Sequence, residues 1–136
     1  MDNNLQILGI ARKAGLLAVG AEDVSKALRT GKAELVISAC DASENALRRA
    51  RKSAEYGGSL YTVAPHKSFE LGSITGRGSP GTLAILDTGL AARFMRGLAE
   101  TDPESYGGTA ELLMKKARVS AEQKRRPLSG KRRTVQ

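Results

Sequence analysis

Apolar residues in the first hundred positions follow two different spacings. Positions 7, 10, 11 and 14 show the i, i+3, i+4, i+7 pattern of a helix, and Gly15 ends that run. Asp41 and Glu44 have the spacing of a capping box, which predicts a helix start before Ala46 and Leu47. The first helix has Asp2 or Asn3 available as its cap, and the other predicted helices cover residues 20–30, 41–57, 67–74 and 88–99.

Short apolar runs between these helices predict strands. They are residues 16–19, 35–40, 60–63 and 82–86. The run from Leu35 to Cys40 is apolar at successive positions, which is typical of a strand that is covered on both faces. Helices and strands that alternate with short links indicate a three-layer α/β/α domain.

The charge divides the chain unequally. Residues 1–102 hold 13 Lys+Arg and 11 Asp+Glu, whereas residues 103–136 hold 9 Lys+Arg and 3 Asp+Glu, so most of the net charge of +8 lies in the last quarter. Asp102-Pro103 and Tyr106-Gly107-Gly108 mark a boundary between the domain and a C-terminal segment. In that segment we predict one weak amphipathic helix, over residues 110–118, and a flexible basic tail.

A basic tail of this kind attracts phosphates without reading a sequence. Its alternative role is to keep the protein soluble. The tail alone therefore indicates a polyanion as partner without identifying it.

The sequence excludes several classes of protein. No apolar stretch is long enough to span a membrane, and residues 1–4 lack the features of a signal peptide. The one cysteine, Cys40, cannot form an internal disulfide, which fits the cytoplasm, and its apolar neighbours predict a buried thiol. His66 is the only histidine and is predicted at the surface or in a cap. No catalytic, metal-binding or cofactor-binding constellation is found, so we expect no enzymatic activity.

A glycine pattern resembling a dinucleotide-binding turn occurs at Gly76, Gly78 and Gly81. That turn requires a strand before it and a helix after it, whereas here a helix precedes and a strand follows. We therefore reject dinucleotide binding. The low aromatic content of 4% also disfavours the stacking sheets of RRM and OB-fold proteins.

The segment from Gly20 to Ala27 is the most informative one. Glu22 and Asp23 occupy the first turn of a predicted helix, and Lys26 follows one turn later. Acidic residues at a helix start and a Glu–Lys pair four residues apart simply stabilise a helix, which is one interpretation. The other is that a carboxylate accepts hydrogen bonds from a guanine edge while the lysine holds a phosphate or the base.

The order of segments resembles a known family. Leu8-Gly9-Ile10-Ala11-Arg12-Lys13-Ala14-Gly15, Val19 to Ala27, Arg29 to Val36, Ala39-Cys40-Asp41-Ala42-Ser43 and the Leu71-Gly72 helix are similar to the kink-turn RNA-binding ribosomal protein superfamily, with its L-seven-Ae, L-thirty-e and bacterial YlxQ and YbxF branches. The resemblance spans residues 3–99. It implies an α/β/α sandwich around a mixed four-stranded sheet.

The resemblance also implies where RNA binds: at the start of the second helix and at the loop before the last strand. The implied RNA-binding residues are Lys13, Gly20, Ala21, Glu22, Asp23, Ser25, Lys26, Arg29, Gly78, Ser79 and Pro80. Glu22 stands where the family usually has Asn, and Asp23 stands where it usually has Glu. These departures predict weaker binding to a standard kink-turn, or a different preferred RNA.

The leading hypothesis is a non-enzymatic, monomeric, cytoplasmic protein that binds ribosomal or other structured RNA in translation. One alternative is the substrate-recognition component of an RNA-modifying enzyme, since similar domains precede some RNA 2′-O-ribose methyltransferases. Another is a protein-interaction scaffold of the same fold, which the pI near 10 disfavours. A stand-alone protein and a fragment of a two-domain chain both fit the start at Met1.

Overall fold

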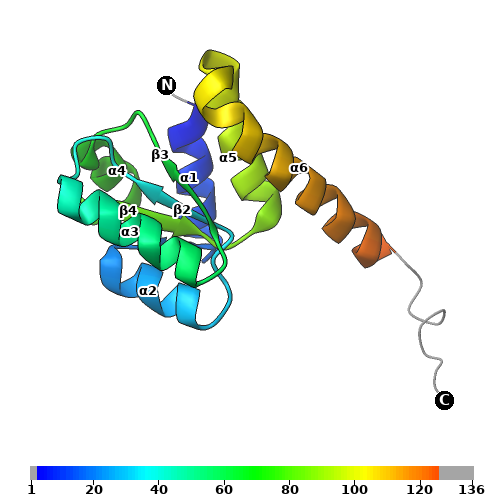
Figure 1. The fold of residues 1–136 in the computed structure, drawn as a ribbon, viewed down its shortest axis with the longest axis horizontal. Coiled ribbons are helices and arrows are strands. Elements are labelled where there is room, and N and C mark those ends of the chain that lie inside the picture. The colour runs from blue at the N-terminus through cyan, green and yellow to red at the C-terminus, as the bar shows by residue number, and fades with distance from the viewer. Residues whose placement is uncertain (1–2, 126–136) are drawn as a thin grey trace.

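The computed structural model describes residues 3–125, and its elements alternate along the chain (Figure 1). In order they are α1 (Asn3–Lys13), β1 (Leu17–Val19), α2 (Ala21–Arg29), β2 (Leu35–Ser38), α3 (Glu44–Tyr56), β3 (Leu60–Val63), α4 (Ser68–Thr75), β4 (Thr82–Ile85), α5 (Thr88–Thr101) and α6 (Pro103–Arg125). The helix and strand types over the first hundred residues agree with the hydrophobic spacing, and most of their ends lie within two or three residues of the predicted ones.

The four strands form one mixed sheet with the order β1-β4-β2-β3. β4 is antiparallel to both of its neighbours, whereas β2 and β3 are parallel. Val19 of β1 pairs with Leu83, and Ser38 of β2 pairs with Thr82. The C-terminal ends of β1 and β2 therefore flank the N-terminal end of β4, so the loops that adjoin these ends meet at one edge.

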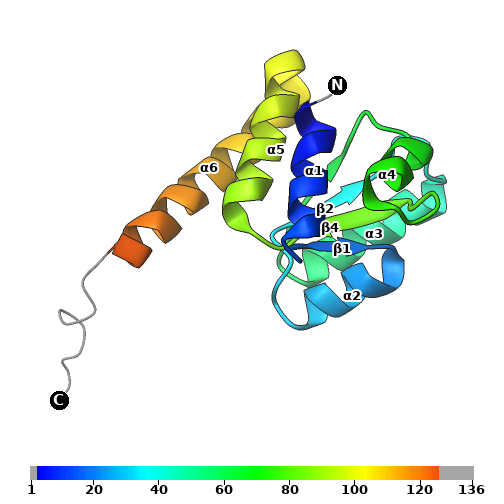
Figure 2. The same cartoon turned by 180° about the vertical axis from the view of Figure 1, so that it is seen from behind.

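Helices cover both faces of the sheet, which confirms the three-layer sandwich (Figures 1 and 2). We call the face covered by α1, α4, α5 and α6 the closed face, and the face covered by α2 and α3 the grooved face. Alternate residues of the central strands point to opposite sides: Leu35 and Ile37 join the core of the closed face, and Val36 joins that of the grooved face. Both sides of β2 are thus buried, as its apolar run predicts.

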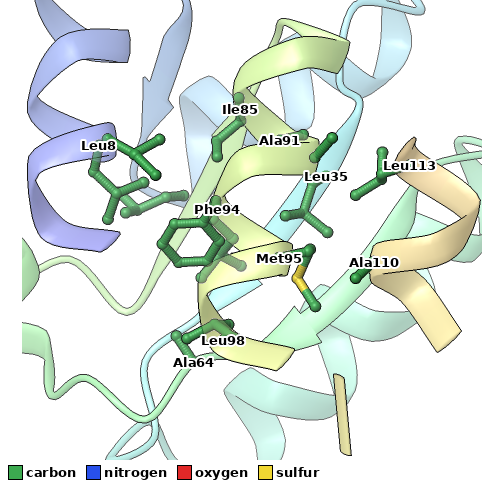
Figure 3. Packing of buried hydrophobic residues seen from close by; sticks show 14 of the residues in the cluster. Leu8, Leu35, Ala64, Ile85, Ala91, Phe94, Met95, Leu98, Ala110 and Leu113 are labelled. Atoms are coloured by element: carbon green, nitrogen blue, oxygen red, sulfur yellow. The ribbon is translucent and has the colours of Figure 1, made fainter. Parts of the chain in front are cut away.

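The core of the closed face is large and is built around Phe94 and Met95 of α5 (Figure 3). Both side chains are fully buried between the sheet, α1 and α6. The core of the grooved face is smaller and contains mainly alanine. Its buried members are Ala18, Val24, Ala27, Leu28, Val36, Ala54 and Ala84.

The C-terminal segment differs from the weak helix predicted for residues 110–118. α6 runs from Pro103 to Arg125, and Ala110 and Leu113 belong to the core of the closed face. The Tyr106 hydroxyl donates a hydrogen bond to the Val63 carbonyl over 2.9 Å, and burial raises the pKa of this tyrosine. The glycines at 107 and 108, interpreted as a boundary, lie inside this helix. Lys124 and Arg125, which belong to the predicted tail, are the last residues of α6, and the rest of the tail lies outside the described residues.

The capping box predicted at Asp41 is wrong. The N-cap of α3 is Ser43, whose hydroxyl accepts a hydrogen bond from the Ala46 N–H over 3.1 Å. Asp41 instead accepts hydrogen bonds from the backbone N–H and the hydroxyl of Ser68, at 2.9 and 3.1 Å. The contact with the Ser68 N–H is the main reason that the pKa of this carboxyl is lowered. Asp41 therefore ties the β2–α3 loop to the start of α4.

Two further expectations are also corrected. Cys40 is exposed, because β2 ends at Ser38 and the chain has already turned out of the sheet. His66 is buried, and its backbone carbonyl accepts a hydrogen bond from the Cys40 N–H over 2.9 Å. Cys40 lies in the turn after β2 and His66 in the turn after β3, so the packing of these turns decides which of the two is exposed.

Candidate nucleic-acid interface

Gly20 starts the candidate site at the N-terminus of α2. Its backbone has φ of +93°, a region that favours glycine, and the following residue begins the helix. Its N–H donates to the Thr82 carbonyl over 3.0 Å. This bond fixes the start of α2 beside the start of β4, so the first turn of α2 has a defined position relative to the loop before β4.

The first turn of α2 presents exposed polar groups. Ala21, Glu22 and Asp23 are all exposed there, as is Lys26 one turn later. Their apolar neighbours Val24 and Leu28 point inward and anchor the helix on the sheet. The carboxylates thus lie beside the free N–H groups at the helix start, and both charge types face solvent.

The loop before β4 lies at the same edge of the sheet. Gly78 and Ser79 are exposed at its tip, whereas Pro80 is buried and Gly81 accepts a hydrogen bond from the Ala39 N–H over 2.9 Å. The loop follows a helix and precedes a strand, which confirms that its glycine pattern is not a dinucleotide-binding turn. Its exposed tip and fixed base are suitable for close contact with a ligand.

Gly72 of α4 sets the position of this loop. A Cβ atom at Gly72 would overlap the carbonyl group of Gly78. The loop backbone therefore rests directly on the helix, at a point where only a glycine leaves enough room. The Leu71-Gly72 pair of the sequence resemblance thus has a structural reason: Leu71 is buried in the core and Gly72 supports the loop.

An ion pair links the two halves of the site. The Arg77 guanidinium lies 3.6 Å from the Asp23 carboxylate, and both side chains are about half exposed. An exposed pair contributes little stability, roughly 0–1 kcal/mol. Asp23 thus pairs with a loop arginine from outside its own helix. The pair offsets part of the negative charge of Asp23 at this surface.

The other predicted residues lie at different distances from this edge. Ser25 follows the first turn of α2, and its hydroxyl accepts a hydrogen bond from the Arg29 guanidinium over 3.0 Å. Arg29 lies at the opposite end of α2, away from the loop. Lys13 is the last residue of α1 and is exposed. The structure therefore brings Gly20–Asp23 together with the loop at 78–80, whereas Arg29 belongs to a different part of the surface.

That part is a groove between α2 and α3, which lie side by side in both views (Figures 1 and 2). One section, of about 460 Å³, begins at Ala21, Gly81 and Thr82, beside the site just described. The next, of about 640 Å³, continues to Gly31 and Gly57. The two sections share Ser25, Leu28 and Ser53 and so form one groove.

The sequence interpretation missed the contribution of α3 to this surface. Arg49 and Lys52 line the groove together with Tyr56, which is 99% exposed. The signal was present as the basic run Arg48-Arg49-Ala50-Arg51-Lys52. It was overlooked because a charged helical face usually means no more than contact with solvent.

A comparison with protein-family models places the chain in a family. Residues 2–91 match the model of the ribosomal protein L7Ae/L30e/S12e/Gadd45 family. Because this match covers well over half of the chain, the chain belongs to that family. No curated protein matches it.

Solved structures support the fold. A protein of unknown function from Bacillus halodurans superposes with a TM-score of 0.64 at 24% identity, covering 71% of this chain and 97% of its own. The Giardia lamblia 15.5kD RNA binding protein superposes with a TM-score of 0.57 at 21% identity, covering 80% and 85%. At these identities the likeness establishes the fold alone.

Two further properties concern the described residues 3–125. They contain no helix of the length and apolarity needed to cross a membrane. They also contain no group of three or more His, Cys, Asp or Glu side chains arranged to hold a metal ion.

Proposed function

We propose that this protein binds structured RNA with an internal loop of the kink-turn type. The observation that carries the proposal is the fixed juxtaposition of the α2 N-terminus with the exposed loop at 78–80, through the bond from Gly20 to Thr82 and the pair between Asp23 and Arg77. Family membership supports RNA as the ligand, and a similarly folded protein carries RNA binding in its name.

In the proposed complex each element has its own task. The Asp23 carboxylate accepts hydrogen bonds from a guanine edge, since an ionised carboxylate is an acceptor only. Lys26 holds a phosphate or an acceptor edge of a base. The loop at Gly78 and Ser79 approaches an extruded nucleotide through its backbone, which the small side chains leave accessible.

The wider role follows from this chemistry. We propose a non-enzymatic, monomeric protein of the cytoplasm that acts on ribosomal RNA or another translation-associated RNA. Domain 1–102 would supply recognition, and the basic segment 103–136 would add sequence-independent attraction to phosphates. Glu22 and Asp23, in place of Asn and Glu, either weaken binding to a standard kink-turn or change the preferred RNA.

A gel-shift series tests the proposal. The probes are a kink-turn RNA and the same RNA with its tandem G·A pairs replaced by Watson–Crick pairs. The intact protein should prefer the first RNA, and Asp23→Ala should lower this preference by about 1–3 kcal/mol. Glu55→Ala, which removes an exposed carboxylate of α3, is the matched control.

A second pair of variants tests the lysine. Lys26→Ala should weaken binding to the kink-turn RNA, whereas Lys32→Ala removes an equal charge from an exposed turn outside the proposed site and should do so less. Equal binding of both RNAs by the intact protein would show that recognition of the internal loop is absent. Unchanged preference in Asp23→Ala would remove the carboxylate from the mechanism.

A further inference from the structure

We propose that the groove between α2 and α3 binds an unpaired RNA strand that leaves the kink-turn site. Its phosphates lie along the basic rim of the groove, and one of its bases stacks on Tyr56. The proposal rests on the proposed function, because the groove is taken to extend the same RNA contact.

The charge of the groove favours a polyanion. Its rim carries Arg29 from α2 and Arg49 and Lys52 from α3, all exposed. None of the residues that line its two sections is an aspartate or a glutamate. The carboxylates of α2 lie in its first turn, outside the groove. The neighbouring kink-turn site is therefore charge-mixed, whereas the groove is purely cationic.

The basic side chains are arranged along a line. Residues 49, 52, 53 and 56 recur at the helical spacing of three or four, so they form one stripe on the side of α3 that faces α2. The hydrogen bond from Arg29 to the Ser25 hydroxyl holds its guanidinium on the opposite wall. From Ala46 to Tyr56 the wall of the groove that α3 forms is about 15 Å long. This length accommodates several nucleotides of an extended strand.

Tyr56 indicates that the strand is unpaired. The protein has only 3 Tyr, 2 Phe and no Trp, and this tyrosine is 99% exposed at the far end of the groove. An exposed aromatic ring next to cationic side chains stacks readily on a free base. Packed helices lie about 8–10 Å apart, so the channel between them is narrower than a double helix.

Continuity with the kink-turn site determines where the strand comes from. Ala21 and Thr82 line the near end of the groove, and both adjoin the Gly20 contact that fixes the site. A strand that leaves an RNA bound at the α2 N-terminus therefore enters the groove directly. The strand meets the uncharged lining residues Val24, Leu28 and Ala50, of which Val24 and Leu28 pack against the sheet.

The test compares two RNA probes with the full-length protein. One is the blunt kink-turn RNA, and the other carries an added unpaired uridine extension of about ten nucleotides, within the size of known single-strand sites. The extension should raise the affinity of the intact protein. The double variant Arg49→Gln, Lys52→Gln should abolish this gain and reduce the salt slope by about 1.4, or 0.7 for each phosphate contact.

The matched control is Arg48→Gln combined with Arg51→Gln. These arginines lie on the same helix and are exposed, but they do not line the groove. The control should keep the gain from the extension. Equal losses in both double variants would mean that the RNA responds only to the overall positive charge of α3. This result would overturn the groove as a binding site.

Tyr56 provides an independent readout. Tyr56→Ala should weaken binding of the extended RNA about 10-fold and leave the blunt RNA unchanged, whereas Tyr56→Phe should keep the stacking. Equal affinity of the intact protein for the blunt and extended probes would overturn the groove proposal. The kink-turn proposal is judged separately, by discrimination between the blunt RNA and its G·A-replaced version.

Discussion

In the part of the chain that the structure describes, four helices form a thick layer on the closed face of the sheet, whereas two helices cover the grooved face. On the closed face, large side chains such as Phe94, Met95 and Leu113 fill the space between sheet and helices. On the grooved face most of the buried residues are alanines, and α2 and α3 leave a channel between them. Stability is thus concentrated on one side of the sheet, and an accessible, cationic surface is found on the other.

The largest expected effect comes from the centre of the closed face. Phe94→Ala should lower the free energy of unfolding by about 3–5 kcal/mol, because it leaves a cavity in a fully buried cluster. Denaturant titration measures the change. The control is Phe69→Ala on α4, whose ring is 64% exposed, and it should change the stability by less than about 0.5 kcal/mol. Similar losses in both variants would contradict the location of the core.

A matched pair of leucines compares the two faces directly. Leu113→Ala on α6 should cost about 3–4 kcal/mol, whereas Leu28→Ala should cost about 2–3 kcal/mol. Leu113 is fully buried, but Leu28 is 8% exposed and borders the groove, where neighbours and solvent occupy the space more easily. The same titration measures both. A smaller loss for Leu113 than for Leu28 would show that α6 adds little to the core.

The junction between the loop and α4 should show a medium effect. Gly72→Ala places a Cβ against the Gly78 carbonyl, so it should lower stability by about 1–3 kcal/mol and also weaken RNA binding. Gly108→Ala, in α6 with no atom near the added Cβ, should instead raise stability by up to about 1 kcal/mol. Normal RNA binding by a destabilised Gly72→Ala protein would show that the loop position does not matter.

The smallest effect concerns the link between the two faces. Asp41 joins the loop before α3 to the start of α4, and its hydrogen bonds with Ser68 lower its pKa below the ordinary 3.8. A lowered pKa stabilises the fold above that ordinary value, and this contribution is lost as the pH falls through the folded-state value. Asp41→Asn should therefore be less stable than the intact protein at neutral pH, and the difference should shrink below about pH 4.

Urea titrations at pH 7 and pH 3 measure this difference. The comparison variant is Asp87→Asn, which changes the N-cap residue of α5 on the closed face. A difference for Asp41→Asn that grows at low pH would contradict the assigned role of the carboxylate.

Local patterns predicted most of the secondary structure, because each helix and strand of the first hundred residues carries its own period. The local patterns were wrong where a contact between distant segments determines the position of a residue. Asp41 has a nearby capping spacing, yet it binds Ser68, 27 residues away. Cys40 and His66 were misplaced because the packing of the turns after β2 and β3 determines which turn residues face the solvent, and this packing is not visible in the sequence.

The candidate site likewise has one part that the sequence predicted and one part that it did not. The segment around Gly20 carries a pattern that can be recognised in the sequence, since a helix start needs a specific succession of residues. The part played by α3 is not visible there, because Arg49 and Lys52 become a binding surface only when α2 lies beside them. A single exposed tyrosine likewise has no signature in a sequence.

The sequence by itself determined the alternation of helices and strands, the separation of charge along the chain and the family pattern at the start of α2. These three features depend on residues that are close in the sequence and on the spacing of apolar positions along it. Only the tertiary structure decided that α6 completes the core, that the loop rests on Gly72 and that Arg29 and Arg49 border one groove. These contacts join segments that are distant in the sequence. The strand order β1-β4-β2-β3 brings such segments together, and they are held there because apolar surface is buried between them.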